Sequence, residues 1–226
     1  MKKISSVLLA GVILTGCASS STAAPATTSA PAEATAETVA AALPAPVDTT
    51  RTYKPTKDGA DTACEAGVFA ADCSSINASN LVDYLGRDDV LYIDLRDYSD
   101  YVGKHLRNFE NIPYFAYIWN ENAGTSDELI QLFSGDVTAP VATYAESETF
   151  LNVLFPKDQT IFLMCQSGGR VANLMKILNA YGYYMTKIYN VGGMGQYTDA
   201  AFASHTTDTI EFKAEVTYSF EGLTKN

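Results

Sequence analysis

The sequence predicts an α/β protein with a central parallel sheet covered by helices. Two short apolar runs, 90–94 and 160–164, are typical of buried strands, and 186–190, which a glycine pair follows, is a third. From Val171 to Tyr181 apolar residues recur with the period of a helix, and Gly182 follows in the position of a C-terminal cap. A strand, a helix and a strand over about thirty residues form a βαβ unit, which implies parallel strands.

Composition narrows the class of protein further. The chain has 226 residues, of which 47% are apolar, enough for one sizeable core but not for two full domains. Acidic residues outnumber basic ones by 26 to 15, which gives a formal charge of −11. Nucleic acids would repel such a chain, so we expect no nucleic-acid partner. After residue 20 no apolar run is long enough to span a bilayer.

The start of the chain carries the features of an export signal. Two lysines precede an apolar stretch (7–14) that is too short to cross a bilayer. The stretch leads into Leu-Thr-Gly-Cys at 14–17, which resembles the lipobox of bacterial lipoproteins. The resemblance implies a signal peptide at 1–16 and a lipid on Cys17, which would anchor the protein to the outer face of a bacterial membrane. An ordinary secretory signal with an incidental cysteine is the alternative.

Beyond the signal the chain divides by composition. Residues 17–50 are low in complexity and poor in large apolar groups, so we expect a disordered tether behind the lipidated cysteine. An N-terminal extension (51–80) and a domain (81–200) follow. Between 210 and 220 apolar and polar residues alternate strictly, which predicts a strand with one buried face within a C-terminal β extension, 201–226.

The stretch from Thr160 to Val171 carries the clearest chemistry. A predicted strand runs directly into Cys165, and Arg170 opens the amphipathic helix. Ligands of open α/β sheets bind beyond the carboxyl ends of the strands. Gly168 and Gly169 allow the loop to curl with N–H groups pointing inward, and the helix adds the positive end of its dipole. We therefore predict a site for a thiolate or a persulfide, with Arg170 offering a planar donor fork to an anion.

Three landmarks resemble the rhodanese family of sulfurtransferases in order and spacing. The first runs from Asp94-Leu-Arg96 to Asn111-Ile-Pro113, the second is Cys165-Gln-Ser-Gly-Gly-Arg170, and the third is Tyr189-Asn-Val-Gly-Gly193. The resemblance implies a rhodanese-like sandwich over 81–200 in which Cys165 is the persulfide-carrying nucleophile. It implies a persulfide cradle built from the loop residues Gln166, Ser167, Gly168, Gly169 and Arg170. It also implies a small sulfur-containing anion as donor, thiosulfate being usual in assays, a thiol or cyanide as acceptor, and no cofactor.

The sequence departs from the family pattern at positions that carry no reactive group. Lys104 and Asn108 each stand where the family has a glycine. Asn108 fits there if its backbone takes the left-handed conformation that glycine would adopt. The stretch 114–158 is longer than usual for the family, so we expect an inserted segment that covers or shapes the site. Within it, 126–133 predicts a short helix.

Other polar residues of the first landmark are predicted to support the structure. Asp94 and Arg96 end a strand near the core, where we expect them to pin loops by hydrogen bonds; an acid–base role is the alternative. His105 is expected to be a core or turn histidine. The spacing of the two histidines and four cysteines fits no zinc-finger pattern, so no metal site is expected.

Two other functions stay open at this point. A protein tyrosine phosphatase also places a cysteine and an arginine around an anion, but it needs five residues between them and this sequence has four. Met164 moreover stands where those enzymes carry a histidine. The second alternative is a non-enzymatic rhodanese fold that binds a partner or senses redox state. The sequence names no protein partner.

Cys64 and Cys73 remain once Cys17 is assigned to the lipid and Cys165 to the chemistry. An exported chain can keep disulfides, and the eight residues between these cysteines suffice for a closed loop, so we predict a bond between them. Two unpaired thiols, or a role in resolving a persulfide on Cys165, are the alternatives.

Overall fold

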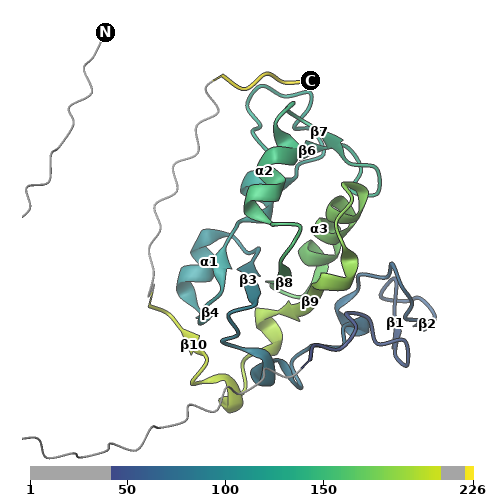
Figure 1. Cartoon of the computed structure of the whole chain (residues 1–226), viewed down its shortest axis with the longest axis vertical. Coiled ribbons are helices and arrows are strands. Elements are labelled where there is room, and N and C mark those ends of the chain that lie inside the picture. Colours follow the sequence, from purple (N-terminus) through teal and green to yellow (C-terminus); the bar gives the residue numbers. More distant parts are fainter. Residues whose placement is uncertain (1–41, 210–221) are drawn as a thin grey trace, which may run out of the picture. The chain divides into compact units, whose positions relative to one another are not determined.

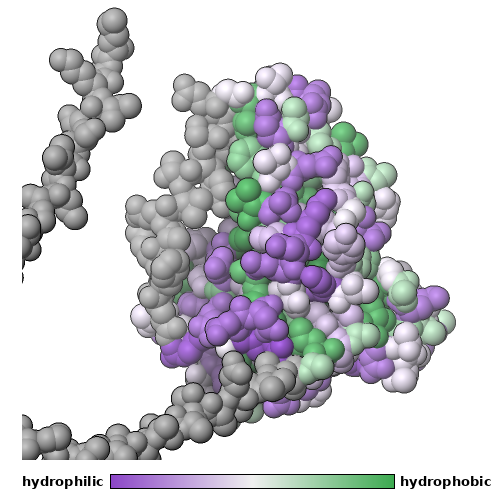
Figure 2. Space-filling view, viewed as in Figure 1, coloured by the Kyte–Doolittle hydropathy of each residue, from purple (hydrophilic) through white to green (hydrophobic). Residues whose placement is uncertain are grey.

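The computed structural model describes residues 42–209 and 222–226 (Figure 1). The predicted signal peptide, Cys17, most of the predicted tether and the alternating segment 210–220 lie outside these ranges. No helix within them is both long and apolar enough to cross a membrane. On the face shown in Figure 2, hydrophilic side chains dominate and smaller hydrophobic areas lie between them.

A four-stranded sheet in the order β5-β3-β8-β9 forms the centre of the domain. Strands β3 (Val90–Asp94) and β8 (Thr160–Cys165) pair in parallel along the whole of β3. On the outer sides, β9 (Ile188–Gly193) pairs with β8, and β5 (Glu110–Asn111) pairs with β3, again in parallel. The α/β class and the parallel sheet predicted from the sequence are confirmed. Because all four strands run the same way, their carboxyl ends meet at one edge.

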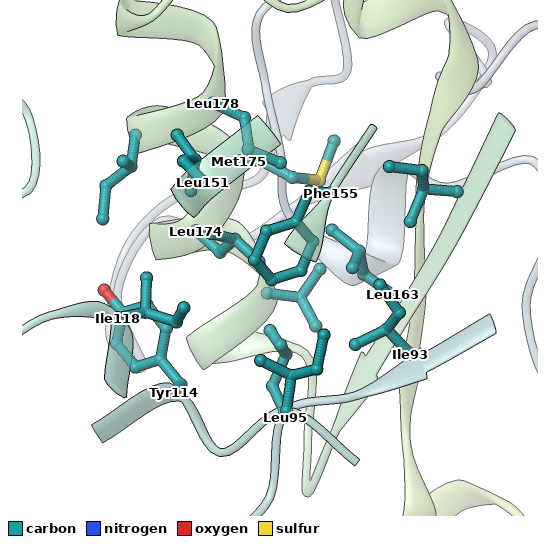
Figure 3. Packing of buried hydrophobic residues seen from close by; sticks show 14 of the residues in the cluster. Ile93, Leu95, Tyr114, Ile118, Leu151, Phe155, Leu163, Leu174, Met175 and Leu178 are labelled. Carbon is teal, nitrogen blue, oxygen red and sulfur yellow. The ribbon is translucent and has the colours of Figure 1, made fainter. Parts of the chain in front are cut away.

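The two longest helices, α2 (Ser147–Leu154) and α3 (Gly169–Ala180), pack on one face of this sheet (Figure 1). Every second residue of β8 points to this face, so Leu163 and Cys165 belong to the same core cluster as the helices. Figure 3 shows the apolar side chains that fill this cluster, among them Leu151, Phe155, Leu163, Leu174, Met175 and Leu178. Phe162 and Met164 point to the opposite face and join a second cluster there. The sheet is therefore buried on both faces, as its apolar strands require.

The remaining elements are short. They are β1 (Thr52–Tyr53), β2 (Thr62–Ala63), η1 (Ala71–Cys73), η2 (Leu81–Tyr84), α1 (Tyr98–Gly103), β4 (His105–Leu106), the π-helical turn η3 (Tyr114–Ile118), β6 (Phe133–Ser134), β7 (Val141–Ala142), η4 (Met185–Lys187), η5 (Met194–Gln196), η6 (Ala200–Phe202) and β10 (Thr206–Thr207). Strand β1 pairs with β2, β6 with β7, and β10 with β4, each antiparallel.

The predicted elements of the βαβ unit agree with the structure except at the third strand. Strand β3 spans the predicted 90–94, and β8 is one residue longer than predicted. Gly182 follows α3 with a φ of +76°, the left-handed conformation expected of a cap. The third strand begins at Ile188 rather than at 186, because the preceding residues form a 3₁₀ turn in which the Lys187 N–H donates to the Tyr184 carbonyl.

The helix predicted at 126–133 is wrong. A single turn forms, in which the Leu129 N–H donates to the Ser126 carbonyl at 3.4 Å, and it does not continue. The Leu132 N–H donates instead to the Tyr117 carbonyl at 3.0 Å, and Phe133 enters strand β6. Long-range backbone bonds therefore replace the local bonds that a helix would need.

The folded part of the chain begins earlier than predicted. Residues 42–50, assigned to the tether, are ordered against the domain: Val47 pairs with Ser74, and the Asp48 N–H donates to the Cys73 carbonyl at 2.8 Å. The Tyr189 hydroxyl donates to the Pro44 carbonyl at 2.6 Å. The predicted boundary after residue 50 is thus corrected, because backbone groups just before it find partners on the domain.

The N-terminal extension contains a disulfide, and the described C-terminal residues pair with residues of the domain. A disulfide joins Cys64 to Cys73, with 5.4 Å between their Cα atoms. Of the predicted C-terminal β extension, the described parts are β10, which pairs with β4, and the last residues, where Lys225 bridges to Tyr144.

Candidate active site

Cys165 ends β8 and lies just below the surface. It is 1% exposed, whereas the following Gln166 and Ser167 are exposed. It is the free cysteine among the described residues. The Gly168 N–H donates a hydrogen bond to its Sγ at 3.1 Å. Gly168 has a φ of +88°, a conformation that costs glycine little, and this turn brings its N–H back to the sulfur.

Residues 165–170, here called the Cys165 loop, offer further donors to an anion. Helix α3 begins at Gly169, and the first N–H groups of a helix have no acceptor within it. In the part of the chain that the structure describes, the N–H groups of Ser167, Gly169 and Arg170 donate to no protein acceptor. A negatively charged group at this loop can therefore accept several backbone hydrogen bonds without displacing an internal one.

The end of β9 supports the Cys165 loop from beneath. A Cβ atom placed on Gly193 would overlap the carbonyl carbon of Gln166 and the amide nitrogen of Ser167. The Gly195 N–H donates to the Gln166 carbonyl at 3.1 Å. The loop backbone thus lies directly on Gly193, which explains physically why a glycine pair closes the third landmark.

Arg170 reaches away from Cys165. Its Nη1 lies 3.5 Å from the Leu95 carbonyl, and its Nη2 lies 3.9 Å from a carboxylate oxygen of Asp97. The guanidinium also lies over the ring of Phe115, 5.2 Å from the centroid. Among the described residues no hydrogen bond joins Arg170 to Cys165. The structure therefore places the predicted donor fork at the rim of the site, next to the turn that follows β3.

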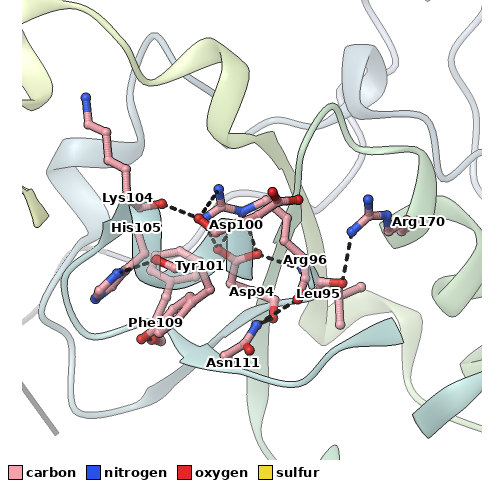
Figure 4. A network of polar contacts seen from close by, with 10 residues as sticks. All are labelled: Asp94, Leu95, Arg96, Asp100, Tyr101, Lys104, His105, Phe109, Asn111 and Arg170. Carbon is pink, nitrogen blue, oxygen red and sulfur yellow. Dashed lines mark hydrogen bonds and ion pairs between the residues drawn. The ribbon is translucent and has the colours of Figure 1, made fainter. Parts of the chain in front are cut away.

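Asp94 and Arg96 form a buried ion pair that pins this turn (Figure 4). The Arg96 Nη2 lies 2.7 Å from Asp94 Oδ2, and the same nitrogen donates to the Lys104 carbonyl at 2.7 Å. The Asn111 side chain donates to the carbonyls of both Asp94 and Arg96. Burial raises the pKa of Asp94, and the hydrogen bonds from Arg96 oppose that shift. The bonds to the carbonyls of Lys104, Asp94 and Arg96 hold backbone around the end of β3.

His105 is a buried partner of Tyr101. It is 3% exposed, its ring stacks on that of Tyr101 at 4.0 Å, and its Nδ1 lies 2.8 Å from the Tyr101 carbonyl. Because a carbonyl only accepts hydrogen bonds, Nδ1 carries a proton. Burial lowers the pKa of His105, which favours the neutral ring. Nearby, Asn108 has a φ of 67°, the left-handed conformation required where the family has glycine.

Sequence reasoning missed three side chains that shape the site. Phe115 and Asp97 hold the Arg170 guanidinium, and neither stands in a pattern that would have indicated this. Asn190 bonds the Cys165 loop, since its Nδ2 donates to the Gly168 carbonyl at 3.1 Å. Asn190 did carry a signal: it is a polar residue between Tyr189 and Val191 in a buried strand.

A parallel sheet whose central strand ends in a cysteine, followed by an N–H-lined loop and a helix, defines an α/β domain with an anion-accepting loop at the carboxyl edge of its sheet. The family model of the rhodanese-like domain matches residues 77–200, more than half of the chain. The chain therefore belongs to the rhodanese-like domain family.

Comparisons with solved structures and with curated proteins add little to the family match. Among solved structures the chain is similar to a rhodanese with anions from E. coli, with 19% sequence identity and a TM-score of 0.30. The match covers 48% of this chain and 92% of that one. A search of curated proteins finds no match.

Proposed function

We propose that this chain is a membrane-anchored sulfurtransferase that carries sulfane sulfur as a persulfide on Cys165. One observation carries the proposal: Sγ of Cys165 accepts the Gly168 N–H at 3.1 Å, at the start of a loop in which the N–H groups of Ser167, Gly169 and Arg170 have no protein acceptor among the described residues. Such a loop stabilises negative charge on sulfur, whether on the thiolate or on the outer atom of a persulfide. Membership of the rhodanese-like domain family supports the reaction class.

The reaction needs two displacements at sulfur. In the first, the Cys165 thiolate attacks the outer sulfur of thiosulfate; an Sγ–S bond forms, the S–S bond of the donor breaks, and sulfite leaves with the electron pair. In the second, cyanide or a thiolate attacks the outer sulfur of the persulfide, and Cys165 leaves as a thiolate. Electrons and atoms balance without a cofactor. The partners are a small sulfur-containing anion and a thiol acceptor.

The depth of Cys165 suits this role. At 1% exposure the sulfur is shielded from bulk water, while Gln166, Ser167 and Gly169 beside it are exposed. A persulfide adds one atom to Sγ, beside a loop in which the N–H groups of Ser167, Gly169 and Arg170 have no protein acceptor among the described residues. The charged outer sulfur would therefore gain backbone hydrogen bonds, whereas the inner sulfur stays buried.

Thiosulfate and cyanide assays test the proposal. Wild-type protein incubated with thiosulfate should gain the mass of one sulfur atom, on the peptide that contains Cys165, and should form thiocyanate when cyanide is added. Cys165→Ser should abolish both, because a serine hydroxyl forms no persulfide. Circular dichroism of the variant controls for folding.

Two outcomes would contradict it. A folded wild-type protein that neither gains sulfur nor forms thiocyanate would favour the alternative, a rhodanese fold that binds a partner or senses redox state. Thiocyanate formation by Cys165→Ser would reject Cys165 as the sulfur carrier.

The proposed location is the outer face of a bacterial membrane, through a lipid on Cys17. It is supported by the Leu-Thr-Gly-Cys sequence at 14–17 after a short apolar stretch. The polar, low-complexity residues that follow would let the domain work at a distance from the lipid surface.

A further inference from the structure

Asn190 is a buried polar residue on an otherwise apolar strand, and its side chain joins three segments. It is 3% exposed. Its Nδ2 donates to the Gly168 carbonyl at 3.1 Å and to the Phe69 carbonyl at 2.8 Å. Its Oδ1 accepts the Gly192 N–H at 3.1 Å. One amide group thus links the Cys165 loop, the N-terminal extension and the glycine pair beneath the loop.

Phe69 belongs to residues 64–73, here called the disulfide loop because Cys64 and Cys73 close it. The same loop touches the Cys165 loop directly: a Cβ atom on Gly168 would lie 2.6 Å from Cβ of Ala71. The disulfide loop lies outside the residues that the family model matches, which begin at 77. A segment that precedes the matched domain therefore contacts the loop that holds Cys165.

The disulfide loop is held at both ends by backbone bonds, in which the Cys64 N–H donates to the Arg51 carbonyl and the Asp48 N–H donates to the Cys73 carbonyl, and Phe69 packs against the core cluster of the domain. An apolar cavity of about 280 Å³ separates it from α3 and from the start of β9. The cavity is lined by Val68, Phe69 and Cys73 on the side of the disulfide loop and by Met175, Met185 and Ile188 on the side of the domain. Beside this cavity, the Asn190 side chain is the polar link between the disulfide loop and the Cys165 loop, since it bonds the carbonyls of Phe69 and Gly168.

We infer that the disulfide loop is a working part of the catalytic site, and that Asn190 is the positioning residue that joins it to the Cys165 loop. The inference rests on the proposed sulfur transfer. The carbonyl that Asn190 holds and the N–H that binds Sγ both belong to Gly168. Because glycine rotates freely about its backbone bonds, this N–H needs an external hold to stay directed at the sulfur.

Asn190→Asp tests the role of the side chain. The variant keeps an acceptor for the Gly192 N–H but turns the donor into an oxygen that faces the carbonyls of Gly168 and Phe69. We expect kcat for thiosulfate to fall about tenfold, with a smaller change in KM, because the charge on Sγ loses its aligned donor. The rate at which iodoacetamide alkylates Cys165, followed by mass spectrometry, should fall as well.

Asn80→Asp is the matched control. The Asn80 Nδ2 donates to the Ser75 carbonyl at 2.9 Å, and its Oδ1 accepts the Asn77 N–H at 2.9 Å, so the chemical loss is similar. None of these groups belongs to the Cys165 loop. This control should show wild-type kcat and alkylation rate even if its thermal stability decreases.

A second variant, Cys64→Ser with Cys73→Ser, opens the disulfide loop and leaves Asn190 in place. This double variant should also lower kcat and the alkylation rate. Adding Asn190→Asp to it should lower both only slightly further, because both changes break the same link between the disulfide loop and the Cys165 loop. The inference is overturned if both variants keep wild-type kcat and alkylation rates, or if their effects multiply fully.

The alkylation rate separates this inference from the proposed function. If the wild-type protein transfers no sulfur, the proposed function is wrong. The alkylation rates of Cys165 would still report whether Asn190 and the disulfide loop position its sulfur.

Discussion

Cys165 and Arg170 stand at opposite ends of one loop and face different partners. The sulfur accepts the Gly168 N–H, whereas the guanidinium contacts Leu95 and Asp97 at the rim. Arg170 keeps 22% of its side chain exposed, so it can meet an incoming donor before the donor reaches the sulfur. In the proposed reaction it therefore attracts and orients the oxygens of the donor, while the loop N–H groups receive the charge on sulfur.

Arg170→Lys should separate these roles. Lysine keeps the charge but loses the planar fork and the stacking on Phe115. We expect kcat/KM for thiosulfate to fall at least about tenfold, mainly through KM, since one or two hydrogen bonds to an anion are lost. Steady-state kinetics with varied thiosulfate measure this effect. Arg87→Lys, which alters an arginine paired with Asp89, is the control. Unchanged kinetics in Arg170→Lys would show that Arg170 has only a structural role.

At the scale of elements, β8 and α3 present the Cys165 loop, and β9 sets its shape. The loop backbone lies on Gly193 without room for a side chain. The turn after β3 lies beside the site, because its Leu95 carbonyl is 3.5 Å from Nη1 of Arg170. Asn111 holds the carbonyls of Asp94 and Arg96 in this turn. The geometry around Cys165 therefore comes from strand ends that are far apart in the sequence.

Gly193→Ala should displace the Cys165 loop. The added methyl group overlaps the peptide between Gln166 and Ser167, so the loop must move away from β9. We expect loss of persulfide formation by at least about tenfold, with destabilisation of about 1–3 kcal/mol from overpacking. Single-turnover sulfur loading and thermal unfolding measure the two effects. The control is Gly103→Ala, which has open space around the new methyl group and should behave as wild type. Sulfur loading at the wild-type rate in Gly193→Ala would contradict the prediction, because it would show that the Cys165 loop tolerates displacement.

The predictability of each element follows from where its determinants lie. Strand β8 and helix α3 were predictable because apolar periodicity and the Gly182 cap are local signals. The segment 126–133 was not, because the Leu132 N–H is taken by Tyr117, fifteen residues away. A local pattern cannot report such a bond.

The same distinction applies to the site. The loop from Cys165 to Arg170 could be predicted because its reactive and anion-binding residues are consecutive in the sequence. The direction of Arg170 toward Asp97, and the link from Asn190 to Phe69, depend on contacts between distant segments. These contacts could be assigned only once the strands had been placed side by side.

For the whole molecule, charge and the proposed anchor act in opposite directions. The formal charge is −11, and a chain cleaved before Cys17 loses Lys2 and Lys3, which leaves 13 basic against 26 acidic residues and a charge of −13. An anionic membrane surface repels such a chain. Stable attachment would therefore depend on the proposed lipid, and the acidic domain would stand off from the surface.

Cys17→Ala should remove that attachment. Cells grown with radiolabelled palmitate should label the wild-type protein and not this variant, because only the thiol accepts the thioether lipid. Without acyl chains the unlabelled protein should move to the soluble fraction or remain as a precursor that keeps its signal peptide, which its larger mass on a gel would show. Cys165→Ala, which removes a cysteine inside the domain, should stay labelled and membrane-bound. Palmitate label on Cys17→Ala, or an unlabelled wild-type protein, would show that the lipid is not carried by Cys17.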